Sequence, residues 1–150
     1  MDKDALIALA TPLLAHLATL DADHPADARR ALAGFDVSAF EAALRAAHAT
    51  GALTPREQAG VRFGRLAKSD ASSFGFSIDI VEMAGPAAGS HLHPAGEFDL
   101  CFALDGDPRF DGHAPGWVVY PPGSRHVPVV TGGRMLIAYF LPGGAIRFDG

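Results

Sequence analysis

The side chains best suited to chemistry in this chain are three histidines and one glutamate in its second half. His91 and His93 are separated by one residue, Glu97 follows a Pro-Ala-Gly turn, and His126 comes later. On an extended strand alternate side chains point to the same face, so the rings of His91 and His93 share one. Three imidazoles and a carboxylate are ligands that first-row divalent metals accept. If strands bring these segments together, the chain contains a buried metal site, which is typical of an enzyme.

This ligand set predicts one divalent metal ion without identifying it. Iron, manganese, zinc and nickel all accept three histidines and one carboxylate. The other histidines lack this spacing, and we interpret them as packed or surface residues: His16, His24, His48 and His113.

The same strand geometry indicates candidates for proton transfer. Asp99 lies two residues after Glu97, so both side chains are expected on the face that carries the metal site. Asp99 could orient a metal-bound histidine, or it could transfer protons itself. Tyr120 and Tyr139 are further candidates, and either could instead form an aromatic wall. Cys101 shares the parity of Glu97, and there a buried structural thiol is expected.

The elements that must position these residues begin with helices. The first fifty residues are rich in alanine and leucine, and leucines recur at helical intervals: Leu6, Leu9, Leu13, Leu14, Leu17 and Leu20. Pro12 predicts a kink or a restart of this helix. A second helix is predicted over 25–32, and Ser38 with Glu41 matches a capping box at the start of a third.

From Val61 onward the pattern changes to alternating apolar residues, which predicts strands separated by Gly, Pro and Asp turns. The clearest strand segments are 74–81, 98–104, 117–120 and 135–141. Short strands at this spacing favour a jelly-roll β-barrel. We therefore predict a mainly β fold, in which a helical N-terminal segment (1–52) packs on a barrel (53–150) as one compact unit.

Composition narrows the classes of protein to consider. The chain has 150 residues, 49% of them hydrophobic, and a formal net charge of −5, which fits one globular domain. It has no cluster of lysine and arginine, so nucleic acid is not an expected partner. The single cysteine allows no internal disulfide, the N-terminus lacks a signal-peptide pattern, and no apolar run approaches the roughly 20 residues that span a bilayer. The cytoplasm is therefore the expected location, with no membrane partner.

Two stretches resemble the motifs of the cupin superfamily. The first motif is a glycine, five residues, His-x-His, three or four residues and a glutamate, and residues 85–97 match it. The second resembles residues 116–126, which keep a Pro-x-Gly-x-x-His core. The glycine that usually closes the first motif comes later here, at Gly106, so a longer hairpin is expected. The resemblance implies a jelly-roll barrel whose metal ligands are His91, His93, Glu97 and His126.

Longer strings resemble the family of 4-hydroxylaminobenzoate lyases. They are residues 62–66, 77–83, 91–97, 116–126 and 139–146. Members of that family combine N-terminal helices with a cupin barrel, and they convert 4-hydroxylaminobenzoate into 3,4-dihydroxybenzoate with release of ammonia. The resemblance implies a metal-dependent carbon–nitrogen lyase that acts on a small aromatic acid.

A benzoate substrate needs a cationic partner for its carboxylate, and arginine can bind a carboxylate through two hydrogen bonds. Arg62, Arg65 and Arg125 lie in or beside the family-like strings. In a strand, Arg62 and Arg65 would face opposite sides, so only one of them could enter a pocket. Each could equally be a solvated or salt-bridged residue.

Two other functions fit the same motifs. The site could belong to an iron-dependent cupin dioxygenase acting on a small aromatic or organic acid. It could also belong to a cupin that binds a small molecule without turnover. Oxygen consumption separates the first alternative from a lyase, and a complete lack of activity identifies the second. Cupins often pair through strand edges, so the resemblance also suggests a homodimer.

Overall fold

The computed structural model describes residues 2–87 and 89–149, and in this part of the chain three helices precede the strands. The helices are α1 (Lys3–Leu17), α2 (Pro25–Ala33) and α3 (Ser38–Ala49), and a short 3-10 helix spans Ala71–Ser73. The strands are β1 (Arg56–Gln58), β2 (Val61–Ala67), β3 (Phe76–Met83), β4 (Ser90–His93), β5 (Glu97–Phe110), β6 (Gly116–Tyr120), β7 (Ser124–His126), β8 (Val130–Pro142) and β9 (Arg147–Asp149). Among the described residues, no helix has the length and apolar character needed to cross a membrane.

Helix α1 begins at a capped N-terminus and continues through Pro12. The side chain of Asp2 accepts hydrogen bonds from the backbone N–H groups of Asp4 and Ala5. The restart predicted at Pro12 is wrong, because one helix runs from Lys3 to Leu17. Proline removes only one backbone hydrogen bond, and a buried face on both sides of it holds the helix in place. That face consists of Leu6, Ala10, Leu13, Leu14 and Leu17.

Helix α3 does not begin with the predicted capping box. Val37 is its N-cap residue, and the Ser38 hydroxyl donates to the carboxylate of Asp36 at 2.6 Å. Glu41 instead pairs with Arg45 one turn further along, at 2.9 Å. The capping-box prediction is therefore wrong, because the N-cap is Val37 and the backbone N–H of Glu41 donates to the Val37 carbonyl at 2.8 Å.

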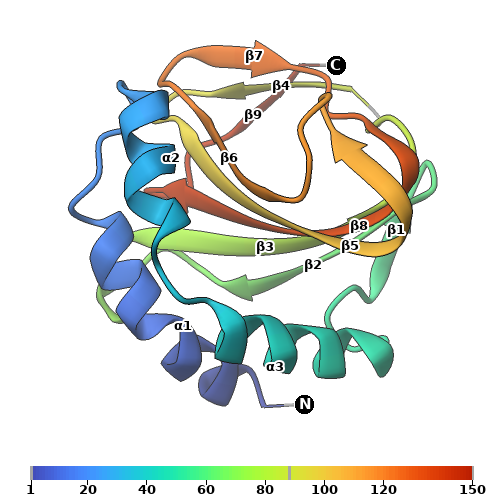
Figure 1. The fold of residues 1–150 in the computed structure, drawn as a ribbon, viewed down its shortest axis with the longest axis horizontal. Helices are drawn as coiled ribbons and strands as arrows, with labels where there is room; N and C mark the ends of the chain where they lie inside the picture. The colour runs from blue at the N-terminus through green and yellow to red at the C-terminus, as the bar shows by residue number, and fades with distance from the viewer. Residues whose placement is uncertain (1, 88, 150) are drawn as a thin grey trace.

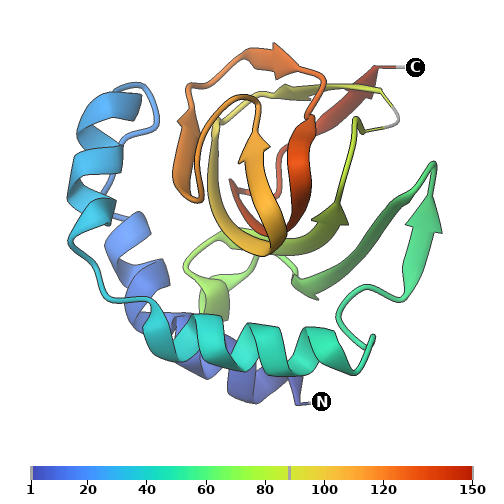
Figure 2. The same ribbon diagram turned by 45° about the vertical axis from the view of Figure 1, so that its right-hand side comes forward.

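The strands form two antiparallel sheets, and the smaller sheet lies over one face of the larger (Figure 1). The larger sheet has the order β1-β2-β3-β8-β5-β6, and the smaller has the order β7-β4-β9. The predicted mainly β fold with N-terminal helices is confirmed. Within the described residues, hydrogen bonding does not join the two sheets into one closed barrel. The helices wrap around the outside of the strands (Figure 2).

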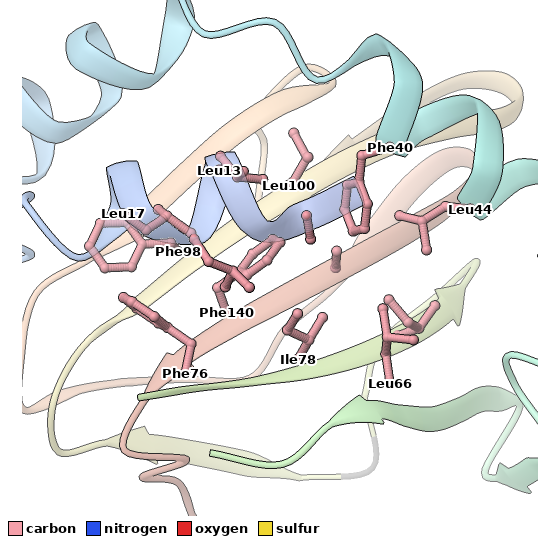
Figure 3. Packing of buried hydrophobic residues seen from close by; sticks show 14 of the residues in the cluster. Leu13, Leu17, Phe40, Leu44, Leu66, Phe76, Ile78, Phe98, Leu100 and Phe140 are labelled. Carbon is pink, nitrogen blue, oxygen red and sulfur yellow. The ribbon is translucent and has the colours of Figure 1, made fainter. Parts of the chain in front are cut away.

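The main hydrophobic core lies between the helices and the outer face of the larger sheet. Alternate residues of β3, β5 and β8 point into it: Phe76, Ile78, Ile80, Phe98, Leu100, Phe102, Leu136, Ala138 and Phe140. Leu13 of α1 and Phe40 and Leu44 of α3 belong to the same cluster (Figure 3). The predicted alternation is confirmed except at Phe74, which precedes β3, has a φ of 55° and is 45% exposed.

The inner face of the larger sheet, which faces the smaller one, combines polar residues with a second apolar cluster. The apolar residues include Met83, Cys101, Phe110, Met135, Ile137 and Leu141. Glu97 and Asp99 lie on the same face of β5, as their parity predicts. Backbone register places a row of side chains across four strands of this face. In this inner row, Arg65 is opposite Asp79, Asp79 is opposite Tyr139, and Tyr139 is opposite Asp99.

Candidate metal centre

Strand pairing and one turn bring the predicted ligands together. β4 pairs with β7 so that His91 lies opposite His126, and His93 is on the same face of β4 as His91. Glu97 is the first residue of β5 and follows a turn at Gly96, whose φ of +82° suits glycine. One ligand atom from each of His93, Glu97 and His126 lies within 4.8 Å of the others. We call these three residues the metal cluster.

The metal cluster is buried, and its polar atoms converge. His93 and Glu97 are 0% exposed, and the His126 side chain is 13% exposed. The Glu97 carboxylate contacts Nε2 of His93, and its other oxygen lies 3.1 Å from Nε2 of His126. Among the described residues, Nδ1 of His93 has no hydrogen-bond partner, and Nε2 of His93 has only its contact with Oε2 of Glu97. Buried polar atoms almost always have one, so this donor set fits a metal ion.

The charges of the cluster also favour a cation. Burial raises the pKa of Glu97, but contacts with Asp99, His126 and His93 outweigh burial and lower it to about 2. Burial lowers the pKa of His126, but Asp111 and Glu97 outweigh that effect and raise it to about 9. Glu97 is therefore ionised at neutral pH, and a metal ion would displace the proton that His126 holds.

His91 lies beside the metal cluster but does not belong to the group of ligand atoms that lie within 4.8 Å of one another. Its ring centroid is 6.0 Å from that of His93 and 6.5 Å from that of His126. Phe148 of β9 packs edge-on against the His91 ring at 4.8 Å between centroids. The structure thus brings three of the four predicted ligands together and leaves the fourth on the same face next to them.

Asp99 is a second buried carboxyl group beside the cluster. It is 0% exposed, and neither of its oxygens has a hydrogen-bond partner among the described residues. Burial and the negative charge of Glu97 raise the pKa of Asp99 well above its ordinary value. The raised pKa favours the protonated form of Asp99, which can donate a proton.

The two tyrosines occupy different parts of the site. Tyr139 lies next to Asp99 in the inner row and is 6% exposed. Burial and nearby carboxylates raise the pKa of Tyr139, so its hydroxyl remains neutral. Tyr120 lies opposite Glu97 in the β5–β6 pairing, and its hydroxyl donates to Asp111 at 2.7 Å.

Asp111 is the residue of this site that the sequence interpretation missed. Its Oδ2 accepts hydrogen bonds from Tyr120 and from Nδ1 of His126, the latter at 2.8 Å. Asp111 precedes Gly112 at the end of β5, so the sequence signal there is an Asp-Gly turn and not a binding group. The Asp-Gly pair marks the hairpin correctly, but it does not indicate what the carboxylate contacts.

Of the three candidate arginines, only Arg65 lies on the inner face of the larger sheet. Its guanidinium donates to the Asp79 carboxylate at 2.9 and 3.3 Å, and its side chain is 53% exposed. The hydrogen bonds to Asp79 and the charge of that carboxylate raise the pKa of Arg65 despite partial burial. Asp79 is a partner that the sequence interpretation did not identify.

The other two arginines face away from the space between the sheets. Arg62 lies opposite Glu82, whose carboxylate contacts His48 of α3, so this pair belongs to the outer, helix-covered face. Arg125 is exposed and lies opposite Leu92, out of phase with His126. The prediction that Arg62 and Arg65 point to opposite sides is confirmed.

A groove of about 900 Å³ lies away from the metal cluster, between α2, α3 and the segment that joins β5 to β6. Arg29, Arg45 and Trp117 are among its lining residues, and no member of the metal cluster is. The candidate centre is therefore identified by the convergence of its ligand atoms and not by cavity size.

Comparison with known proteins agrees with the resemblance found in the sequence. A family model described as PnbB, 4-hydroxylaminobenzoate lyase, matches residues 18–148. Proteins named 4-hydroxylaminobenzoate lyase from Pseudomonas putida and from Nocardioides sp. (strain LMS-CY) are 32% and 34% identical over 103 and 95 residues. Each match covers 59% of this chain, and they cover 58% and 56% of the two relatives, respectively. The chain thus matches less than two thirds of either relative.

Solved structures similar to this chain include cupins. An RmlC-like cupin protein from Ralstonia eutropha has a TM-score of 0.44 and 19% identity, covering 60% of each chain. A cupin-like protein from Thermotoga maritima has a TM-score of 0.43 and 17% identity, covering 62% of this chain and 78% of that one. The family model spans most of the sequence, including every residue of the metal cluster. The chain therefore belongs to the 4-hydroxylaminobenzoate lyase family.

Proposed function

We propose that this chain is a metal-dependent lyase that converts 4-hydroxylaminobenzoate and one water into 3,4-dihydroxybenzoate and ammonia. The reaction balances without an outside oxidant, because the nitrogen is reduced as its N–O bond breaks while the ring is oxidised. The observation that carries the proposal is the buried, partly unpartnered metal cluster in a chain of this family. Carbon–nitrogen cleavage then releases the nitrogen as ammonia.

In this proposal His93, Glu97 and His126 hold one divalent metal ion, and His91 completes the set from the same face. Their donor types accept iron, manganese, zinc or nickel. A metal bound there would act as a Lewis acid toward the hydroxylamino oxygen and would make hydroxide available near neutral pH.

Asp99 is the residue we propose to move protons. It is buried, its raised pKa favours the protonated form, and it lies two residues from a proposed metal ligand on the same face. Departure of oxygen from nitrogen and departure of ammonia both require proton delivery. Tyr139 adjoins Asp99 and provides a second hydroxyl on this face, while Tyr120 already donates its proton to Asp111.

Arg65 is the residue we propose to bind the substrate carboxylate. It belongs to the inner row, three strands from Asp99, which is roughly 14 Å along the sheet at a strand spacing of about 4.8 Å. A benzoate lying along the row would span from the metal cluster toward the guanidinium. Asp79 then holds Arg65 in place and leaves some of its N–H donors for the ligand.

The test is an anaerobic activity assay with purified protein loaded separately with Fe²⁺, Mn²⁺, Zn²⁺ or Ni²⁺. Added 4-hydroxylaminobenzoate should yield 3,4-dihydroxybenzoate and ammonia in equal amounts with at least one metal. His93→Ala should abolish turnover and metal retention, whereas His24→Ala, which removes an exposed histidine, should change neither. Arg65→Gln should raise KM more than it lowers kcat.

The two alternatives give different results in the same assay. A dioxygenase would consume O₂ as it formed product, so it would show no activity under anaerobic conditions. A binding protein without turnover would retain the metal and bind the substrate, but no ammonia would form. Lack of turnover with all four metals would refute the lyase proposal.

A further inference from the structure

We propose that Asp111 is a positioning residue of the metal centre. Its carboxylate holds His126 with Nδ1 protonated and with Nε2 directed at the metal. This inference rests on the metal-binding part of the proposed function and not on the identity of the substrate.

The first observation is the contact between the two side chains. Nδ1 of His126 lies 2.8 Å from Oδ2 of Asp111, and Nε2 of the same ring lies 3.1 Å from the Glu97 carboxylate. A carboxylate can only accept, so each ring nitrogen donates its proton to the carboxylate that it faces. A metal ion would replace the proton on Nε2, and the Nδ1–H would stay with Asp111 and leave the lone pair on Nε2. That lone pair points to the side where the other cluster ligands converge.

A second group fixes the same carboxylate oxygen and the plane of the ring. The Tyr120 hydroxyl donates to Oδ2 of Asp111 at 2.7 Å, and the Tyr120 ring lies 4.4 Å from the His126 ring with 34° between their planes. The imidazole is therefore held along its edge by Asp111 and across its face by Tyr120. Both contacts limit rotation of the ring away from the cluster.

The backbone around Asp111 holds the carboxylate rigidly. Oδ1 accepts a hydrogen bond from the N–H of Val129 at 2.9 Å, and the N–H of Asp111 donates to the Val129 carbonyl at 2.8 Å. Asp111 has a φ of 49°, a left-handed conformation that aspartate tolerates better than most residues, and Gly112 follows with a φ of 84°. Both Asp111 oxygens are thus engaged, and the side chain is 14% exposed.

The experiment compares Zn²⁺ affinity and the His126 tautomer in wild type and in Asp111→Asn. Zn²⁺ affinity is measured by competition with a chelator, and the tautomer is read from ¹H–¹⁵N spectra of the histidine rings. Wild type should show a slowly exchanging Nδ1–H on His126. Asp111→Asn should weaken Zn²⁺ binding about 10- to 100-fold and alter that signal. The matched control is Asp107→Asn, an exposed aspartate of β5 four residues before Asp111, which should change neither measurement.

Each outcome decides for or against the positioning role. Equal Zn²⁺ affinity in Asp111→Asn and wild type would overturn it, and so would a wild-type His126 protonated at Nε2 in the Zn²⁺ form. If Asp111→Asn does not fold, the wild-type tautomer still decides. Tyr120→Phe removes only one donor to Asp111. It should keep the Nδ1–H of His126 and should weaken Zn²⁺ binding less than Asp111→Asn does. Zn²⁺ binding without turnover would count against the proposed reaction and leave this inference intact.

Discussion

Glu97 and Asp99 are neighbouring carboxyl groups on one strand, and their surroundings shift their pKa values in opposite directions. Burial raises the pKa of both groups, but contacts with Asp99, His126 and His93 lower that of Glu97, whereas the adjacent negative charge of Glu97 further raises that of Asp99. Such a separation gives one group the role of a ligand and the other the role of an acid. The pair therefore supports distinct functions for two chemically similar side chains.

Asp99→Asn tests the acid role directly. Asparagine has the shape of a protonated aspartate but cannot release a proton, so the fold and the metal content should stay close to wild type. We expect kcat to fall by about 100-fold or more, the range typical for loss of a general acid. Metal analysis, melting temperature and steady-state kinetics measure the three quantities. Undiminished kcat would mean that Asp99 only orients its neighbours.

Cys101 should be unreactive in the folded protein. It is 1% exposed, and burial together with the charges of Glu97 and Asp111 raises the pKa of its thiol. Alkylation by iodoacetamide at pH 8 should therefore be slower in the native state than in urea by roughly two orders of magnitude. Mass spectrometry gives a single readout, because the chain has one cysteine. Fast native labelling would show that the inner face opens readily.

Strand parity explains which site residues could be predicted from sequence. Alternation forces Glu97 and Asp99 to one face wherever the strand lies, so their proximity follows from local geometry alone. The contact between Asp111 and His126 depends instead on the length of the β5–β6 hairpin. β5 runs for 14 residues with two shifts of register against β8, so no local pattern in the sequence predicts which side chain the Asp111 carboxylate contacts.

Among the elements, the turn between β4 and β5 has the strictest requirement. Gly96 has a φ of +82°, and a Cβ there would lie 2.8 Å from both the Ala22 Cβ and the Tyr120 carbonyl oxygen. The turn thus needs glycine both for its backbone conformation and for its close packing. It also joins the two elements that carry His93 and Glu97.

Gly96→Ala should therefore destabilise the fold more than Gly60→Ala. Gly60 has the same φ of +82°, but a Cβ there would meet nothing within 4 Å. Both substitutions incur the left-handed backbone cost of about 1–2 kcal/mol, and only Gly96→Ala adds a steric clash. Urea unfolding of the two variants measures the difference in free energy. Equal losses of unfolding free energy would mean that Ala22 and the end of β6 move to accommodate the added Cβ without destabilising the fold.

Helix ends were harder to predict than helix positions. Leucine periodicity indicates α1 correctly, because the buried face is a property of the whole segment. The restart considered at Pro12 and the capping box expected at Ser38 come from local signals that the surrounding structure overrides. Packing of α1 against the sheet outweighs one lost hydrogen bond, and the backbone N–H of Glu41 donates to the Val37 carbonyl instead of to the Ser38 side chain.

At the scale of the whole molecule, one core connects the helices with the strands that carry the metal cluster. β5 has its outer residues in the main core and its inner residues at the site, so the helix layer and Glu97 are supported by the same strand. Trp117 of β6, the single tryptophan, packs against this core with its ring 5.8 Å from Phe140. We therefore propose that helices and sheets unfold as one unit.

Leu14→Ala and Leu9→Ala, on the same helix, test this unit. Leu14 is 0% exposed and Leu9 is 44% exposed. Truncation of the buried leucine should cost about 2–5 kcal/mol, whereas truncation at the exposed position should stay within about 0.5 kcal/mol. Circular dichroism reports mainly on the helices and Trp117 fluorescence on β6. If one core holds the helices and β6 together, the unfolding midpoints from circular dichroism and from fluorescence must shift together in Leu14→Ala, because two-state unfolding gives coincident transitions. A fluorescence transition that stays at the wild-type midpoint while the helical signal is lost earlier would show two separate units.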